Sequence, residues 1–141
     1  MARSSDQVRR EVCAVPYRIR DERAEFCLVS TERTSRWEFP HTEITGDQPP
    51  LNAAHRCVRE QAGLACRVEA CQPLDDVLAT QNRQLVRMVA FLLEIQEAEP
   101  TAAQRRTRWC FAEEARARIR RKPMRRLIDL ALRQIAGEAG Q

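Results

Sequence analysis

The chain has 141 residues, of which 43% are hydrophobic and 31% are charged. This length and composition fit one globular domain with a core of its own and exclude an intrinsically disordered chain. The net charge of +4 is too small to indicate nucleic-acid binding by itself. Lys122 is the only lysine, so arginine carries nearly all of the positive charge. Two interpretations stay open: an anionic partner bound by guanidinium forks, or a coding bias toward arginine.

The six cysteines contain no C-x-x-C pair, and most stand beside apolar residues, where cysteine behaves as a small buried side chain. The start of the chain is polar and does not resemble a signal peptide, and no apolar run approaches the length of a membrane span. We therefore expect a cytoplasmic protein with free thiols and no membrane partner. The two histidines, His41 and His55, are too few and too separated to predict a zinc site with these cysteines.

The first elements are predicted to form a hairpin. Residues 8–20 and 25–31 are rich in β-formers, and a polar turn at 21–23 joins them. This pattern predicts two antiparallel strands, preceded by a disordered tail over residues 1–7. Residues 34–50 contain three prolines and a glycine, which predict an irregular segment.

A helix is predicted next, over residues 50–62. Apolar residues recur at helical spacing, Pro50 suits the first turn, and Gly63 suits the position just after the helix. After this helix we predict a strand in the first half of 64–78, an apolar strand over 85–95, a loop over 97–104 and a strand over 108–112. Two helices are predicted to follow, one over 113–120 and an amphipathic one that begins at Pro123. The apolar stripe of the last helix consists of Leu127, Leu130, Ala131, Gln134 and Ile135, of which only Gln134 is polar. Because the helices are few for so many strands, we expect a single α/β (α+β) domain over residues 8–137, with a mixed sheet between helices.

The centre of the chain carries a motif. Residues 37–42 read WEFPHT, and residues 53–64 read AAHRCVREQAGL. This segment resembles the Nudix box, in which a glycine, five residues, a glutamate and seven residues precede Arg-Glu-hydrophobic-x-Glu-Glu-x-Gly-hydrophobic. The opening hairpin, the segment 109–115 (WCFAEEA) and the last helix are also similar to the Nudix (MutT-like) hydrolases. The resemblance spans nearly the whole chain and implies an α/β/α sandwich with a mixed sheet.

Several positions depart from the box. Thr42 stands at the box glycine, Gln48 at the first glutamate, Cys57 at the glutamate that follows the arginine, and Gln61 at the second glutamate of the pair. The positions that match are Arg56, Val58, Glu60, Gly63 and Leu64. For an active member, the resemblance implies Mg²⁺ or Mn²⁺ held by carboxylates at i, i+3 and i+4 on one helix face.

Of those three carboxylates Glu60 remains, so we expect divalent-ion binding to be weakened and a cofactor to be present only if the chain is active. Glu94 or Glu97 could supply another metal ligand from outside the box. Arg56 and Glu60 are either the remnant of a catalytic apparatus or an ordinary i, i+4 ion pair. Cys57 is either a nucleophile or an inert thiol.

The candidate phosphate-binding residues are Arg33, Arg36 and Arg87, because the hairpin end, the following loop and a central strand could bring them to one cleft. Trp37 either stacks on a ligand base or packs on the sheet. The expected partner is therefore a phosphorylated small molecule, a nucleotide or a polyphosphate.

Three functions stay open. The first is a Nudix-like protein that binds a nucleoside diphosphate derivative or another polyphosphate and whose pyrophosphohydrolase activity is weak or lost. The second is an active, metal-dependent pyrophosphohydrolase with relocated carboxylates. The third is an RNA- or protein-binding module that uses the basic segment 116–126, although that segment lacks the interleaved aromatic residues typical of nucleic-acid binding. The sequence predicts neither the substrate nor the oligomeric state.

Overall fold

The computed structural model describes residues 8–31, 36–99 and 102–139. The predicted tail over residues 1–7 lies outside these ranges. In chain order, the elements are β1 (Arg9–Arg20), β2 (Arg23–Ser30), β3 (Trp37–Glu38), β4 (His41–Glu43), α1 (Pro50–Ala62), β5 (Leu64–Ala65), a 3₁₀ helix (Val68–Ala70), β6 (Cys71–Gln81), β7 (Gln84–Glu94), β8 (Glu97–Ala98), β9 (Thr107–Phe111), α2 (Ala112–Arg118) and α3 (Lys122–Ala139).

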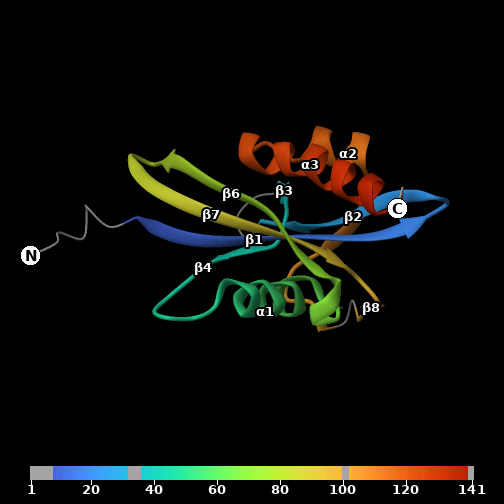
Figure 1. Ribbon diagram of the computed structural model, residues 1–141, viewed down its shortest axis with the longest axis horizontal. Coiled ribbons are helices and arrows are strands. Elements are labelled where there is room, and N and C mark those ends of the chain that lie inside the picture. Colours follow the sequence, from blue (N-terminus) through green and yellow to red (C-terminus); the bar gives the residue numbers. More distant parts are fainter. Residues whose placement is uncertain (1–7, 32–35, 100–101, 140–141) are drawn as a thin grey trace, which may run out of the picture.

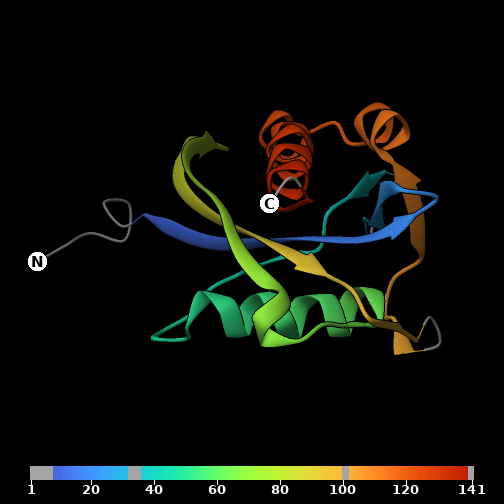
Figure 2. The same cartoon turned by 45° about the vertical axis from the view of Figure 1, so that its right-hand side comes forward.

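A mixed β-sheet separates α1 on one face from α2 and α3 on the other (Figure 1, Figure 2). The strand order is β3-β2-β1-β7-β6, with β4 also paired to β1 and β9 to β2. β1 pairs antiparallel with β2 and parallel with β7, which makes the sheet mixed. The predicted α/β (α+β) architecture is therefore confirmed. Among the helices that the structure describes, none combines the length and the apolar character needed to span a membrane.

The β1–β2 hairpin is confirmed at its predicted place. Arg20 lies opposite Arg23, so the connecting loop consists of Asp21 and Glu22. These two residues have φ values of 53° and 64°, and a type I′ turn requires positive φ at both positions. This two-residue loop fixes the register of β1 against β2 and thereby decides which β1 side chains face each layer of helices.

Alternate side chains of β1 enter two separate cores. Cys13, Val15 and Tyr17 belong to the core shared with α2 and α3, whereas Val12 and Ala14 belong to the core shared with α1. All five are buried. Because side chains alternate along a strand, burial of both faces explains why β1 is apolar through its middle.

The predicted stripe of α3 faces the sheet. Leu127 and Ala131 are fully buried, and Leu130 and Ile135 are half-buried against the same core. The polar member of the stripe, Gln134, bonds through its Nε2 to the side-chain oxygen of a glutamine on β6 at 2.5 Å. The stripe therefore packs as the sequence predicts, and its one amide has a partner.

The strand predicted in the first half of 64–78 is wrong in its position. That half contains the two-residue strand β5, paired with β8, and the 3₁₀ helix, whereas the long strand β6 begins at Cys71. β6 carries Asp75, Asp76 and Thr80 and shows no clear apolar alternation, because it is an edge strand that pairs with β7 alone. In the same way, β8 lies within the segment predicted as a loop, and β3 and β4 lie within the segment predicted as irregular.

α1 ends as predicted, at a glycine. Gly63 has φ 65°, and its N–H bonds to the carbonyl of Arg59 at 3.1 Å. The backbone of Glu99 passes directly beside it: Glu99 N donates to the Gly63 carbonyl at 2.7 Å. A Cβ on residue 63 would overlap the Glu99 carbonyl. Both the positive φ and this close approach require glycine at position 63.

We expect Gly63→Ala to lower the free energy of unfolding by about 2–5 kcal/mol, since positive φ costs about 1–2 kcal/mol and overlap with packed backbone adds about 1–3 kcal/mol. Gly46→Ala is the matched control, because Gly46 also has positive φ, 60°, but has nothing within 4 Å of an added Cβ. Only the first cost applies there. Urea unfolding measures both losses, and equal losses would contradict the close approach of Glu99.

Candidate functional site

Gln61 joins α1, the helix that carries most of the motif over residues 53–64, to the segment that precedes it. Its Nε2 donates a hydrogen bond to the backbone carbonyl of His41 at 2.9 Å. His41 is the first residue of β4 and pairs with Cys13 of β1, so the bond ties α1 to the sheet. The other amide atom, Gln61 Oε1, is buried and has no hydrogen-bond partner within the described chain. Residue 61 therefore presents a donor to a carbonyl, at the position where the resemblance noted from the sequence places a glutamate.

Cys57 lies on the buried face of the same helix. Its side chain is 2% exposed. Burial raises the pKa of this thiol to about 12, and the nearby guanidinium groups of Arg105 and Arg56 lower it only in part. Because the thiolate is the nucleophile, a buried thiol that is protonated at neutral pH supports the inert interpretation of Cys57.

Arg105 brings a positive charge to the C-terminal end of α1. Backbone hydrogen bonds hold its loop there: Gln104 N donates to the Glu60 carbonyl at 2.9 Å, and Arg105 N donates to the Gln61 carbonyl at 3.2 Å. Arg105 Nη1 lies 3.3 Å from Glu38 Oε1, and the two side chains are 19% and 14% exposed. The ion pair is thus largely shielded from water and lies beside the box helix.

Trp37 lies next to a second arginine. The guanidinium carbon of Arg106 is 5.7 Å from the centre of the Trp37 ring, which is within reach of a cation–π contact. The backbone sets this proximity, because Ser30 N donates to the Arg106 carbonyl and Thr31 N donates to the Arg36 carbonyl. We call the group formed by Arg36, Trp37, Glu38, His41, Gln61, Arg105 and Arg106 the β3 corner.

Trp37 is half-buried and packs against the core that contains α2 and α3, and it forms a bridge with Ile119. Packing on the sheet is therefore part of its role, and the remaining exposed part of the ring is what a ligand could contact. Arg36 is exposed at the same corner. Sequence reasoning named Arg36 and Trp37 but missed Arg105 and Arg106, which enter from a loop far along the chain.

Of the other two predicted phosphate-binding residues, Arg87 does not join this group. Arg33 lies outside the described residues. Arg87 is exposed on β7 and makes two hydrogen bonds to the Asp76 carboxylate, at 2.8 and 2.7 Å. These bonds lower the pKa of Asp76. Because β2 and β1 lie between β3 and β7, Arg87 and Trp37 are separated by roughly 14 Å of sheet at ordinary strand spacing.

The three predicted carboxylates lie on different elements, Glu60 on α1, Glu94 at the end of β7 and Glu97 on β8. Glu60, Glu94 and Glu97 are all exposed. Glu94 accepts a hydrogen bond from the Tyr17 hydroxyl at 3.3 Å, and Glu97 belongs to β8, paired with β5. None of the three belongs to a cluster of three or more potential metal ligands among the described residues. The remaining box residue, Arg56, reaches the Gln48 side-chain oxygen at 3.5 Å.

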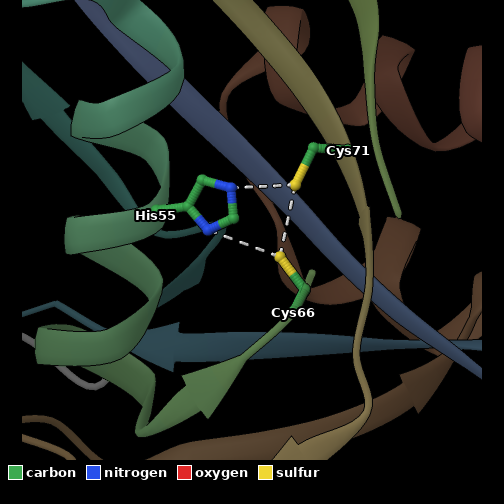
Figure 3. A group of neighbouring side chains, drawn as sticks. All are labelled: His55, Cys66 and Cys71. Atoms are coloured by element: carbon green, nitrogen blue, oxygen red, sulfur yellow. Dashed lines mark hydrogen bonds between the residues drawn. The ribbon is translucent and has the colours of Figure 1, made fainter. Parts of the chain in front are cut away.

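A cluster of potential metal ligands lies between α1 and the start of β6. It consists of His55 on α1, Cys66 just after β5, and Cys71 at the start of β6 (Figure 3). The two sulfur atoms are 3.3 Å apart, and His55 Nε2 lies 3.1 Å from the Cys71 sulfur. His55 Nδ1 lies 3.7 Å from the Cys66 sulfur. The prediction that the histidines are too separated from the cysteines to share a site is therefore wrong for His55.

Burial affects the protonation of all three groups. It raises the pKa of Cys66 and of Cys71, and the Glu69 carboxylate raises that of Cys71 further. Burial lowers the pKa of His55, and the positive charge of Arg59 lowers it further. In the absence of a cation, these shifts favour two neutral thiols and a neutral imidazole at neutral pH. The spacing His-x10-Cys-x4-Cys was the available sequence signal, and it departs from familiar zinc motifs.

The sequence matches no protein-family model and no curated protein. Solved structures match closely in shape. An Ap4A hydrolase of C. elegans, solved as a binary complex, has a TM-score of 0.75 at 17% identity and covers 92% of this chain and 99% of its own. The Nudix domain of Shewanella oneidensis NrtR, solved with ADP-ribose, has a TM-score of 0.77 at 16% identity and covers 92% and 89%. A Nudix hydrolase from Nitrosomonas europaea has a TM-score of 0.74 at 17% identity and covers 88% of each chain. This chain has the Nudix fold.

Within the Nudix fold, the basic segment 116–126 is partly neutralised. Arg116 Nη2 lies 2.5 Å from the Asp129 carboxylate, and Arg118 Nε lies 2.7 Å from that of Glu114. These pairs join α2 to α3 and stabilise α2 itself. The geometry is that of a solvated, ion-paired helix end. This explains the run of charged residues without a nucleic-acid partner.

We expect the ion pair between Arg105 and Glu38 to stabilise the folded chain measurably. Because both side chains are largely shielded, Arg105→Gln should lower the free energy of unfolding by about 1–3 kcal/mol, and the loss should shrink in the Glu38→Gln background. Arg116→Gln is the control: its pair with Asp129 is 41% and 53% exposed, so its loss should stay within about 1 kcal/mol. Denaturant unfolding of the double-mutant cycle checks both values, and additive effects of Arg105→Gln and Glu38→Gln would contradict the pairing.

Proposed function

We propose that this Nudix-fold protein binds a polyphosphorylated, nucleotide-type small molecule at the β3 corner and that its pyrophosphohydrolase activity is weak or lost. The observation that carries the proposal is the hydrogen bond from Gln61 to the His41 carbonyl. It supports a helix α1 in which the Gln61 amide nitrogen bonds to the protein itself without a divalent ion, while Gln61 Oε1 has no partner in the described chain. The chain would then act as a ligand-binding or regulatory domain.

The residues at the box positions do not fit Mg²⁺ or Mn²⁺. These hard cations require several oxygen ligands, most of them charged. A carboxylate at position 61 would need a cation between itself and the His41 carbonyl, because both are acceptors. The amide of Gln61 needs none, since it donates directly. At position 57 the side chain is a buried thiol, a soft donor.

The position of Arg105 also disfavours a divalent ion. Its guanidinium stands beside Glu38 at the end of the box helix and supplies a fixed positive charge there. A divalent cation brought close to it would be repelled, because charges interact strongly in a site shielded from water. We infer that this arginine, rather than an ion, balances the acidic side chain of the corner.

The β3 corner has the groups that a nucleotide-type ligand requires. Arg36 and Arg106 are exposed, and guanidinium groups bind phosphate oxygens through paired hydrogen bonds. The partly exposed side chain of Trp37 could stack on a base through the part that the core does not cover. The structural neighbours support this class of ligand, because one of them was solved with ADP-ribose and another is an Ap4A hydrolase. Arg33 and Arg87 remain predicted contributors for a ligand long enough to reach them.

The alternative is an active enzyme in which Glu60 binds an ion together with Glu94 or Glu97. The exposed positions of these carboxylates leave each of them available to solvent ions, but the described chain does not gather them into one cluster. The ion-paired state of Arg116 and Arg118 gives no support to an RNA-binding role. The cytoplasmic location expected from the sequence stays a prediction, with which the six free thiols are compatible.

A panel of ADP-ribose, dinucleoside polyphosphates and nucleoside triphosphates tests the proposal. At least one of them should raise the melting temperature in Mg²⁺ without release of phosphate or nucleotide. Arg106→Gln and Trp37→Ala should each weaken that binding about tenfold or more, the effect of losing one charge-assisted hydrogen bond or one stacking contact. Titration calorimetry measures the affinities.

Arg23→Gln is the matched control, because Arg23 is an exposed arginine at the opposite end of β2 from the corner. Its affinity should equal that of the wild type. The proposal is wrong if the wild type hydrolyses any of these compounds with Mg²⁺ and Glu60→Gln abolishes the reaction. That outcome would establish a working enzyme with relocated ligands.

A further inference from the structure

We propose that His55, Cys66 and Cys71 form a binding site for a zinc ion that fastens the start of β6 to the box helix. The inference goes beyond the proposed function, because none of these residues belongs to the β3 corner. The three side chains come from three separate places, namely α1, the segment after β5 and the first residue of β6, and their ligand atoms all lie within 4.8 Å of one another (Figure 3).

The distances between the ligand atoms are close to those of a tetrahedral zinc site. Zinc binds thiolate sulfur at about 2.3 Å and imidazole nitrogen at about 2.0–2.1 Å, so a tetrahedral site has sulfur atoms about 3.8 Å apart and sulfur and nitrogen about 3.6 Å apart. The sulfur atoms of Cys66 and Cys71 are 3.3 Å apart, His55 Nε2 lies 3.1 Å from the Cys71 sulfur, and the other ring nitrogen, Nδ1, lies 3.7 Å from the Cys66 sulfur. Because an imidazole gives a zinc ion one nitrogen, only one of the two sulfur–nitrogen distances belongs to the site. A shift of the sulfur atoms by about half an ångström and a turn of the imidazole that aims one nitrogen between them would complete the geometry.

The donor set selects the ion. Thiolate and imidazole suit Zn²⁺ and other thiophilic cations, whereas Mg²⁺ prefers oxygen. On binding, each thiol loses its proton to solvent, so Zn²⁺ with two thiolates and a neutral imidazole carries no net charge. One ring nitrogen of His55 faces each sulfur atom, so the histidine adds a third ligand beside the two cysteines, which a disulfide alone would not use.

The surroundings leave room for a fourth ligand. Within the described chain the cluster contains three protein ligands, so a water molecule would complete the tetrahedron. Cys66 lines a cleft of 850 Å³ together with Glu69, Glu94 and Gln96, which gives water access to the cluster. Glu69 adds a negative charge near Cys71, and this charge favours a bound cation.

The role that follows is structural. The segment between β5 and β6 has little regular structure beyond the 3₁₀ helix Val68–Ala70, and a zinc ion would link its two ends to α1. The two cores do not depend on the ion, because both sulfur atoms lie at the margin of the α1-side core. We therefore expect the metal-free chain to fold and zinc to raise its melting temperature.

Zinc content of the full chain, purified under reducing conditions with zinc in the medium, tests the site. The wild type should hold one zinc per chain, and the Co²⁺-loaded protein should show the sulfur-to-metal charge-transfer band and the visible bands of tetrahedral cobalt. Cys66→Ser, Cys71→Ser and His55→Ala should each bind Zn²⁺ at least about 100-fold more weakly, since even loss of an outer partner costs about 10–100-fold. Mg²⁺ should not compete.

Cys110→Ala is the control for cysteine loss, because Cys110 is buried on β9, outside the cluster. It should keep one zinc per chain. Far-ultraviolet circular dichroism verifies that each variant is folded, and the half-exposed positions of Cys66 and Cys71 make folding of the serine variants the expected result. The proposal is overturned if folded wild type takes up no zinc, if the serine variants retain it, or if mass analysis finds Cys66 and Cys71 joined in a disulfide in zinc-supplied protein.

Discussion

The hydrogen bond between the Gln61 side chain and the His41 carbonyl holds together the parts of the molecule on which the functional interpretation depends. Through His41 it ties α1 to β4 and hence to β1, the strand that is buried on both faces. The Gln61 carbonyl in turn accepts the Arg105 N–H, which fixes the loop that delivers two arginines to the β3 corner. A single residue therefore connects the helix, the sheet and the basic loop.

Charge balance at this corner is achieved by protein groups. An amide in place of a carboxylate removes one negative charge and adds a donor, and Arg105 supplies the positive charge beside Glu38. Under the proposed function, each change lowers the need for a divalent ion, and together a hydrogen bond and an ion pair take over the ion's role. Unsatisfied polar groups and unpaired charges are costly in a site shielded from water. We therefore expect the amide at position 61 and the arginine at position 105 to occur together. The proposed zinc site has a different role, because it links the start of β6 to α1 and shares no residue with the β3 corner.

Local sequence signals predicted most of the fold. The hairpin followed from alternating β-formers around a short polar turn, and α1 followed from its apolar spacing and from Gly63, whose positive φ is visible to sequence reasoning as a glycine at the end of a helix. β6 was misplaced because an edge strand tolerates Asp75 and Asp76, so its composition carries no strand signal.

The functional groups were harder to predict, because they depend on contacts between distant segments. Arg105 and Arg106 reach the β3 corner through backbone hydrogen bonds to α1 and β2, which no side-chain pattern reveals. His55, Cys66 and Cys71 are brought together by the Gly63 turn and the start of β6, a route that the sequence leaves open. Residue types could be assigned from the motif, but the partners of each residue required the fold.

Unfolding of the wild type and of Gln61→Glu in metal-free buffer, with and without added Mg²⁺, tests the central claim most directly. The claim predicts that Gln61→Glu loses about 1–3 kcal/mol of stability without metal, because two acceptors then face each other. It also predicts that Mg²⁺ leaves the wild type unchanged. Stabilisation of the wild type by Mg²⁺, lost in Glu60→Gln, would contradict the claim and show that the box helix still holds an ion.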